Sequence, residues 1–124
     1  MNPKHCTSLE ISKQLAEAGF KKKTEFWWIP EAVNNEIQWR IDTFNSNYTC
    51  YFKDTKLEKI PAPLATELLE ELPSKLQRYT LTIFKYDVKY FCCYPDNEKW
   101  KGEDFILPNA LAKLWLYLKQ QKLT

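Results

Sequence analysis

The order of helical and strand patterns along the chain constrains its fold more than any other sequence feature. Apolar residues recur at helical spacing in three segments, near the beginning, the middle and the end of the 124 residues. Strand patterns fall between these segments in groups, three before the middle helix and two after it. Strands that follow one another without an intervening helix usually pair as antiparallel hairpins. The sequence therefore predicts an α+β fold: an antiparallel sheet of about five strands built from hairpins, with three helices packed mainly on one face.

The helix boundaries are predicted from capping signals. A capping box with Thr7 as the N-cap begins a helix over residues 8–18, and Gly19 ends it as a left-handed residue. A second helix is predicted over residues 63–72, with a proline at its first position. Pro108 opens the third helix, whose broad apolar stripe predicts that it is the most buried of the three.

The strands are predicted from alternation and aromatic content, at residues 26–29, 37–43, 48–52, 80–84 and 90–94. Pro30 is expected to stop the first of them, and Ile37, Trp39 and Ile41 are expected to face the core.

The connections follow from the same patterns. Residues 45–47 are expected to make a hairpin turn, and residues 86–88 a second one. The charged segment 53–59 and the polar segment 95–104 are expected to be loops.

Composition places the chain among folded single domains. The aromatic content of 15% is far from the aromatic-poor profile of disorder, and no linker or repeat interrupts residues 1–124. Only Gly19 and Gly102 are present, which excludes glycine-rich phosphate loops and dinucleotide fingerprints. The net charge of +2 provides no global basic field for nucleic acid.

No membrane or export signal is recognised in the sequence. The residues at the N-terminus lack an apolar run followed by a cleavage site. No stretch approaches the roughly 20 apolar residues that span a bilayer. A cytoplasmic location is therefore expected.

The four cysteines are expected to be free thiols, because a chain with a large apolar core and no export signal needs no disulfides. No Cys-x-x-Cys motif is present, and adjacent Cys92 and Cys93 would point to opposite faces of a strand. We therefore expect neither a metal site nor a cofactor.

Candidate catalytic groups are few. His5 and Cys6 adjoin in sequence and could form a thiol nucleophile, but no oxyanion-hole motif accompanies them and Cys6 has a packing role before the first helix. The acidic pairs at 70–71 and 103–104 lack a motif that would place two carboxylates across a cleft. The sequence therefore predicts that the chain is not an enzyme.

Three blocks of sequence resemble a family of small phage and prophage open reading frames. They are Ser-Leu-Glu-Ile-Ser-Lys-Gln-Leu-Ala-Glu-Ala-Gly-Phe, Ile-Pro-Ala-Pro-Leu-Ala-Thr-Glu-Leu-Leu-Glu-Glu-Leu-Pro and Leu-Pro-Asn-Ala-Leu-Ala-Lys-Leu-Trp-Leu-Tyr-Leu-Lys-Gln, which together span residues 8–120. The family brings no catalytic residues to transfer. The resemblance implies a mobile-element origin, hence the cytoplasm of an infected or lysogenic bacterium, and an accessory role such as disarming a host defence system.

The most suggestive cluster for binding a partner combines Lys21, Lys22 and Lys23 with Trp27 and Trp28. Lysines neutralise phosphates, and exposed aromatic rings stack on unpaired bases or fill hot spots of protein interfaces. The structural alternative is that the lysines complement the dipole of the preceding helix and that one tryptophan lies in the core.

Trp100, in a polar segment, is a further candidate for partner binding, unless it packs back into the core. Together these features favour a non-enzymatic protein that binds a host protein or ribonucleoprotein, for example as an anti-CRISPR-like inhibitor of a defence nuclease. A single-stranded nucleic-acid-binding protein is the first alternative, and a small dimeric structural component is the second.

Overall fold

The computed structural model describes residues 5–43, 49–76, 79–94 and 101–121. Within them lie three helices: α1 (Leu9–Glu17), α2 (Ala65–Glu71) and α3 (Leu107–Gln120). The strands before α2 are β1 (Trp27–Val33), β2 (Glu36–Asp42), β3 (Thr49–Phe52), β4 (Thr55–Glu58) and β5 (Ile60–Pro61). The strands after α2 are β6 (Lys75–Leu76), β7 (Tyr79–Thr80), β8 (Thr82–Tyr86), β9 (Lys89–Cys93) and β10 (Lys101–Asp104).

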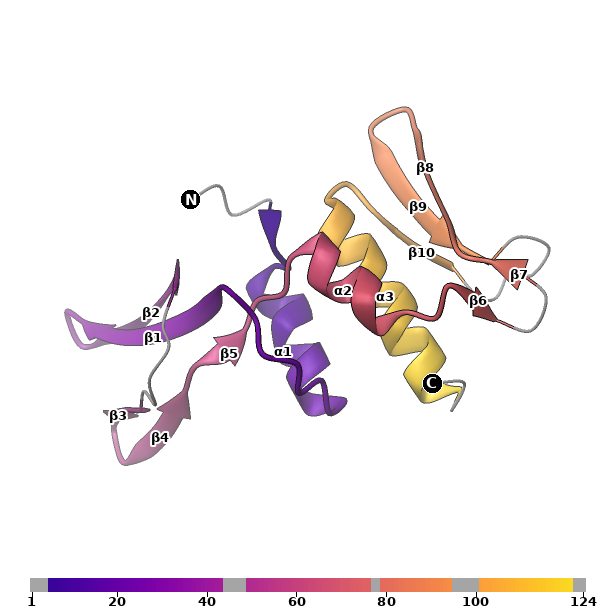
Figure 1. Cartoon of the computed structure of the whole chain (residues 1–124). Coiled ribbons are helices and arrows are strands. Elements are labelled where there is room, and N and C mark those ends of the chain that lie inside the picture. The colour runs from indigo at the N-terminus through magenta and orange to yellow at the C-terminus, as the bar shows by residue number, and fades with distance from the viewer. Residues whose placement is uncertain (1–4, 44–48, 77–78, 95–100, 122–124) are drawn as a thin grey trace.

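The strands form four small antiparallel sheets. Two have three strands, in the orders β2-β1-β5 and β10-β9-β8, and two are the pairs β3-β4 and β6-β7. The helices lie between the N-terminal and the C-terminal groups of strands (Figure 1). The α+β class and the hairpins are confirmed, whereas the single sheet of about five strands with helices on one face is corrected.

Two tight turns close hairpins in the part of the chain before α2. Asn34 and Asn35 both have positive φ, as do Lys53 and Asp54, so each pair closes a hairpin locally. The predicted charged loop 53–59 is therefore wrong, since it contains a hairpin turn and β4. The predicted turn at 45–47 lies outside the described residues.

Pro30 does not stop β1, contrary to the expectation. It lies inside the strand, opposite Trp39 of β2, and it is buried. On its other edge β1 pairs with β5 only at Trp27 and Trp28. Proline is tolerated here because its missing N–H falls where β1 has one partner strand instead of two.

The core is centred on α3. The buried apolar residues, drawn mainly from the helices with Cys92 and Tyr94 beside them, are Ile11, Leu15, Phe20, Leu68, Leu72, Cys92, Tyr94, Ala110, Leu111, Ala112, Leu114, Trp115 and Leu118. Phe20 meets Trp115 edge-on at 5.3 Å between ring centroids. The prediction that α3 is the most buried helix is confirmed, because the residues of its predicted apolar stripe are buried in this core.

Ile37, Trp39 and Ile41 of β2 are only half-buried, so their predicted place in the core is corrected.

The helix starts differ from the predicted ones by one or two residues. Ser8, not Thr7, is the N-cap of α1, and its side chain accepts from the amide of Ile11 at 3.4 Å. Thr7 is buried, and its hydroxyl forms a hydrogen bond of 2.6 Å with that of Ser12, so Thr7 is part of the interior and does not cap the helix. Gly19 has φ of 92° and ends the helix as predicted.

Helix α2 begins at Ala65, after Pro63 rather than at it, and residues 101–104 form β10 although they were expected to be loop. Strand β10 packs on α3 through Gly102. A Cβ there would lie 2.2 Å from the carbonyl oxygen of Ala110, so only glycine allows the strand backbone to approach the helix backbone this closely.

Candidate functional site

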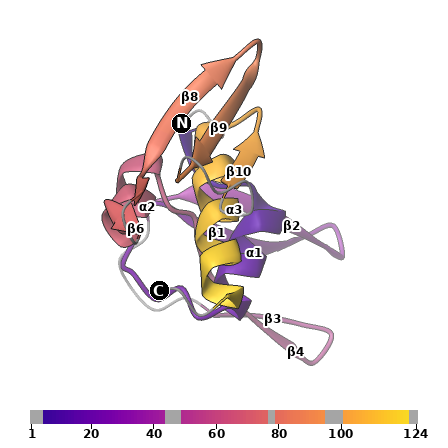
Figure 2. The ribbon, with the colours of Figure 1, turned by 90° about the vertical axis from the view of Figure 1, so that its right-hand side faces the viewer.

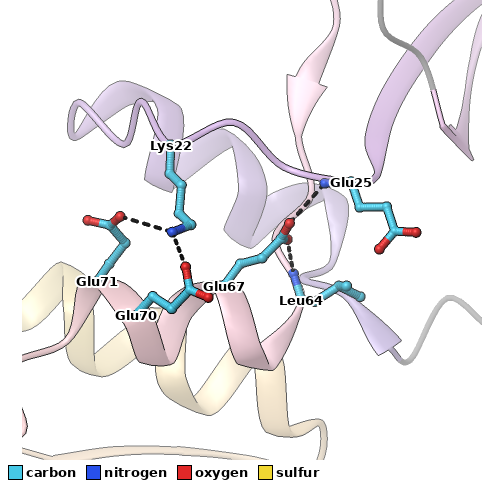
Figure 3. Close-up of polar contacts among 6 residues, drawn as sticks. All are labelled: Lys22, Glu25, Leu64, Glu67, Glu70 and Glu71. Atoms are coloured by element: carbon cyan, nitrogen blue, oxygen red, sulfur yellow. Dashed lines mark hydrogen bonds and ion pairs between the residues drawn. The ribbon is translucent and has the colours of Figure 1, made fainter.

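The lysine segment is tied to α2. The ammonium of Lys22 pairs with the carboxylate of Glu70 and lies 3.5 Å from that of Glu71 (Figure 3). The hydrogen bond to Glu70 is the largest cause that raises the pKa of Lys22. Its side chain is 23% exposed, whereas Lys21 and Lys23 are exposed. Lys22 therefore has acidic partners within the chain, and Lys21 and Lys23 lie open to solvent.

Glu67 fixes the same segment from a second point. One carboxylate oxygen accepts from the amide of Glu25 at 2.9 Å, and the other accepts from the amide of Leu64 at 2.8 Å (Figure 3). Glu67 thus caps the start of α2 and also holds the chain that leads into β1. The segment from Lys22 to Glu25 therefore serves as a strap across α2.

The two adjacent tryptophans are also engaged in the fold. The indole nitrogen of Trp28 donates to the carbonyl oxygen of Thr7 at 3.0 Å, which joins β1 to the start of α1. Trp27 carries the ammonium of Lys59 3.9 Å from its ring centroid, and its own indole nitrogen is buried without a hydrogen-bond partner. Both tryptophans are half-buried, so neither offers an open aromatic platform, and the contacts just described are with Thr7 and Lys59 and not with the three lysines. Trp100 lies outside the described residues.

A different aromatic surface stands on the hairpin β8–β9. Ile83 and Cys92 are directly opposite, and Cys92 is buried against the core. Because side chains alternate along a strand, Phe84 and Tyr86 on β8, and Phe91 on β9, occupy the other face. We call these three residues the outer aromatic face. Figure 2 shows the hairpin that carries it projecting beyond the start of α3.

The outer aromatic face is both exposed and ordered by stacking. Phe84 and Phe91 are cross-strand partners whose rings lie 5.2 Å apart and 11° from parallel. Phe84 is 48% exposed and Tyr86 is 74% exposed. Val88 at the hairpin tip and Phe105 after β10 are exposed as well. Exposed apolar residues gathered on one element are characteristic of interaction sites, whereas single ones are ordinary.

Charges of both signs lie around this face. Lys101 and Glu103 on β10 share its side of the sheet, since they are opposite Cys93 and Phe91. On the hairpin, Lys89 is opposite Tyr86 on the same side, and its ammonium lies over the ring of Phe105 at 5.1 Å. A mixed rim around aromatic rings is typical of protein interfaces.

A pocket lies at the start of α2 and of α3. Its volume is about 520 Å³, within the range of ligand pockets. It is lined mainly by apolar residues of the two helix starts, with side chains from β9, from the turn after β10 and from the N-terminal segment: His5, Leu64, Ala65, Thr66, Tyr90, Phe105, Ile106, Leu107 and Pro108.

The candidate catalytic groups are held in structural roles. Burial, with the carboxylate of Glu67, raises the pKa of Cys6 to about 11, so its thiol stays protonated at neutral pH. Glu70 and Glu71 face Lys22. Asp104 lies 2.7 Å from the ammonium of Lys113. Burial of Asp104 opposes its ionisation, but the contacts with Lys113 and Ile106 outweigh it and lower its pKa.

None of the four cysteines, all of which lie in the described residues, forms a disulfide, as the sequence predicts. Cys92 and Cys93 point to opposite faces of β9, since they are opposite Ile83 and Thr82 respectively. Among the described residues no cluster of three His, Cys, Asp or Glu side chains is arranged to hold a metal ion. Nor is any helix in this part of the chain long and apolar enough to cross a membrane.

Comparison of the chain with family models, curated proteins and solved structures finds no match. The function must therefore be argued from the surfaces just described. The sequence interpretation located the hairpin β8–β9 but assigned it no binding role. The signal was available in the alternation Thr82-Ile83-Phe84-Lys85-Tyr86, which places Phe84 and Tyr86 opposite to Ile83.

Proposed function

We propose that the chain is a non-enzymatic binding protein that docks on a protein partner through the outer aromatic face of the hairpin β8–β9. The observation that carries the proposal is the stacked pair Phe84–Phe91 with Tyr86 beside it, exposed on a projecting hairpin. Aromatic residues at the centre of a contact provide most of the binding energy in protein interfaces. The mixed charges at the rim suit a protein surface better than a uniformly negative phosphate backbone.

The resemblance to phage and prophage open reading frames supports a biological role in which the chain binds a component of the host. An accessory protein of a mobile element that lacks catalytic parts acts by occupying a host target. We therefore propose a host protein or ribonucleoprotein as the partner, with inhibition of a defence nuclease, as in anti-CRISPR proteins, as the biological result. The exposed lysines Lys21, just before the strap across α2, and Lys23, within it, are candidates for a secondary contact.

A pull-down from a bacterial host lysate tests this proposal. The tagged chain and the double variant Phe84→Ser/Tyr86→Ser are compared, with nuclease treatment of each lysate. The matched control is Tyr51→Ser, because Tyr51 is 72% exposed on the other hairpin, β3–β4. We expect a nuclease-resistant protein that is captured by the wild type and by Tyr51→Ser and lost with the double variant. Equal capture by all three proteins would contradict the assignment of the surface.

A single-stranded nucleic-acid-binding function is the second candidate. It is favoured by one observation, that stacked aromatic rings and Lys101 share one side of a small antiparallel sheet. This version predicts that the affinity for a labelled oligonucleotide falls steeply with salt, because each phosphate contact releases counterions. A flat salt dependence, or no binding at low salt, would exclude it.

A further inference from the structure

The pocket at the start of α2 and α3 differs from the outer aromatic face in both position and chemistry. Its walls come from Leu64, Ala65, Ile106, Leu107 and Pro108, which offer an apolar chain contacts on several sides. The pocket lies where the two helices begin, and Tyr90 of β9 forms part of its wall. An occupant of this space therefore contacts residues from both halves of the sequence.

Two lysines of the hairpin lie beside the pocket, although neither lines it. Tyr90 and Phe105 line it, and the ammonium groups of Lys85 and Lys89 lie against these two rings, 5.2 and 5.1 Å from the ring centroids. Both ammonium groups are thereby held near the pocket by contacts with aromatic faces. The lining itself contains no carboxylate.

Two acidic groups on the elements beside the pocket already have partners, whereas Asp87 lies in the turn between Lys85 and Lys89. Asp104, before the lining residue Ile106, pairs with Lys113 and accepts from the amide of Ile106 at 3.0 Å. Glu67, on α2, accepts from the amides of Leu64 and Glu25. Neither carboxylate is paired with Lys85 or Lys89, so the cationic character of the rim is not cancelled by these two groups.

We infer that this pocket binds a small amphipathic carboxylate, with the apolar chain among the helix starts and the carboxylate toward Lys85 and Lys89. The volume of about 520 Å³ accommodates a chain of medium length or a ring. This inference does not depend on the proposed function, since Phe84, Tyr86 and Phe91 of the outer aromatic face do not line the pocket. Either one can fail without the other.

The test uses three probes with the same alkyl chain and different polar head groups: octanoate, octanol and octylammonium. The ¹⁵N-labelled full chain is titrated with each and followed by amide chemical shifts. We expect saturable shifts at Ala65, Thr66 and Leu107. Octanoate should bind about threefold to fivefold more tightly than octanol, the gain expected from partly exposed ion pairs, and octylammonium should bind most weakly.

Protein variants test the contacts of the probe's head group and those of its alkyl chain separately. Lys85→Gln/Lys89→Gln should reduce the octanoate affinity to that of octanol and leave octanol unchanged. Thr66→Trp, at an exposed position that lines the pocket, should abolish binding of all three probes. Lys53→Gln/Lys56→Gln on the distant hairpin β3–β4 is the matched charge control and should change nothing.

Three results would overturn the inference. They are the absence of saturable shifts at the pocket up to the solubility limit of octanoate, equal affinity for the three heads, and shifts centred on Phe84 and Phe91 instead of the helix starts.

Discussion

At the scale of single residues, Gly102 is a position where the fold leaves no room for a side chain. A Cβ there would lie 2.2 Å from the carbonyl oxygen of Ala110 and 2.8 Å from the amide nitrogen of Leu114, both backbone atoms of α3. Neither atom can move without displacing the helix. We expect Gly102→Ala to lower the free energy of unfolding by about 1–3 kcal/mol, as overpacking of a tight site does.

The control is the other glycine. Gly19 has φ of 92° but nothing within 4 Å of the added Cβ, so Gly19→Ala should cost only the backbone strain, about 1 kcal/mol. Urea denaturation measures both variants. A Gly102→Ala protein no less stable than Gly19→Ala would show that β10 does not contact α3 as described.

Because of Cys6, the free energy of unfolding is expected to depend on pH in the alkaline range. Its thiol is fully buried, and burial raises its pKa from 9.0 to about 11. The folded chain therefore retains a proton that the unfolded chain releases above about pH 9. This stabilising contribution, about 3 kcal/mol for a shift of this size, is complete below pH 9 and is lost as the pH rises through about 11.

Cys6→Ala removes that titration. We expect the urea midpoint of the wild type to fall between pH 8 and pH 11, and that of Cys6→Ala to fall less steeply, whatever its starting stability. Cys92 and Tyr94, whose pKa values burial raises to about 12, maintain a decline in both proteins. Parallel curves for the two proteins would contradict the account of Cys6.

At the scale of elements, the strap formed by Lys22 to Glu25 joins the approach to β1 to helix α2. We expect Lys22→Gln to lower the melting temperature, because it removes the contacts with Glu70 and Glu71. The exposed neighbour Lys21 provides the matched substitution, Lys21→Gln, which should leave the melting temperature unchanged. The difference between them should shrink in high salt, since ions screen exposed pairs. Equal melting temperatures would return Lys22 to the candidate contacts for a partner.

The hairpins show which elements the sequence predicts and which it does not. Alternation placed β2 and β9 within one residue of their observed bounds and β8 within two. The turn Lys53-Asp54 was missed because lysine is not favoured at positive φ, and local pairing of β3 with β4 outweighs that preference. Pro30 was misinterpreted because its tolerance depends on where β5 ends, which no local pattern encodes.

At the scale of the whole molecule, the arrangement of sheets could not be derived from local patterns. The α+β class and three helices follow from periodicity, but the position of α3 between two groups of strands depends on contacts between distant segments. The amide of Ser8, for example, donates to the side chain of Asn109 at 2.9 Å and ties the start of α1 to α3.

The candidate site illustrates the same limit. The lysines and tryptophans singled out from the sequence are adjacent in the chain, and the fold uses Lys22 and Trp28 for internal contacts. The outer aromatic face became visible only when the register placed Phe84 opposite Phe91, on the side away from Cys92. Which aromatic residues remain exposed is a property of packing, and composition does not specify it.

The central claim, that the outer aromatic face contacts a protein partner, is tested most directly by photo-crosslinking in a bacterial host lysate. The photoreactive residue p-benzoylphenylalanine replaces Phe84 in one protein and Tyr51 in the other, since both positions are exposed but lie on different hairpins. We predict a discrete, nuclease-resistant adduct from position 84 and none from position 51. No adduct at position 84, or the same adduct from both positions, would contradict the account.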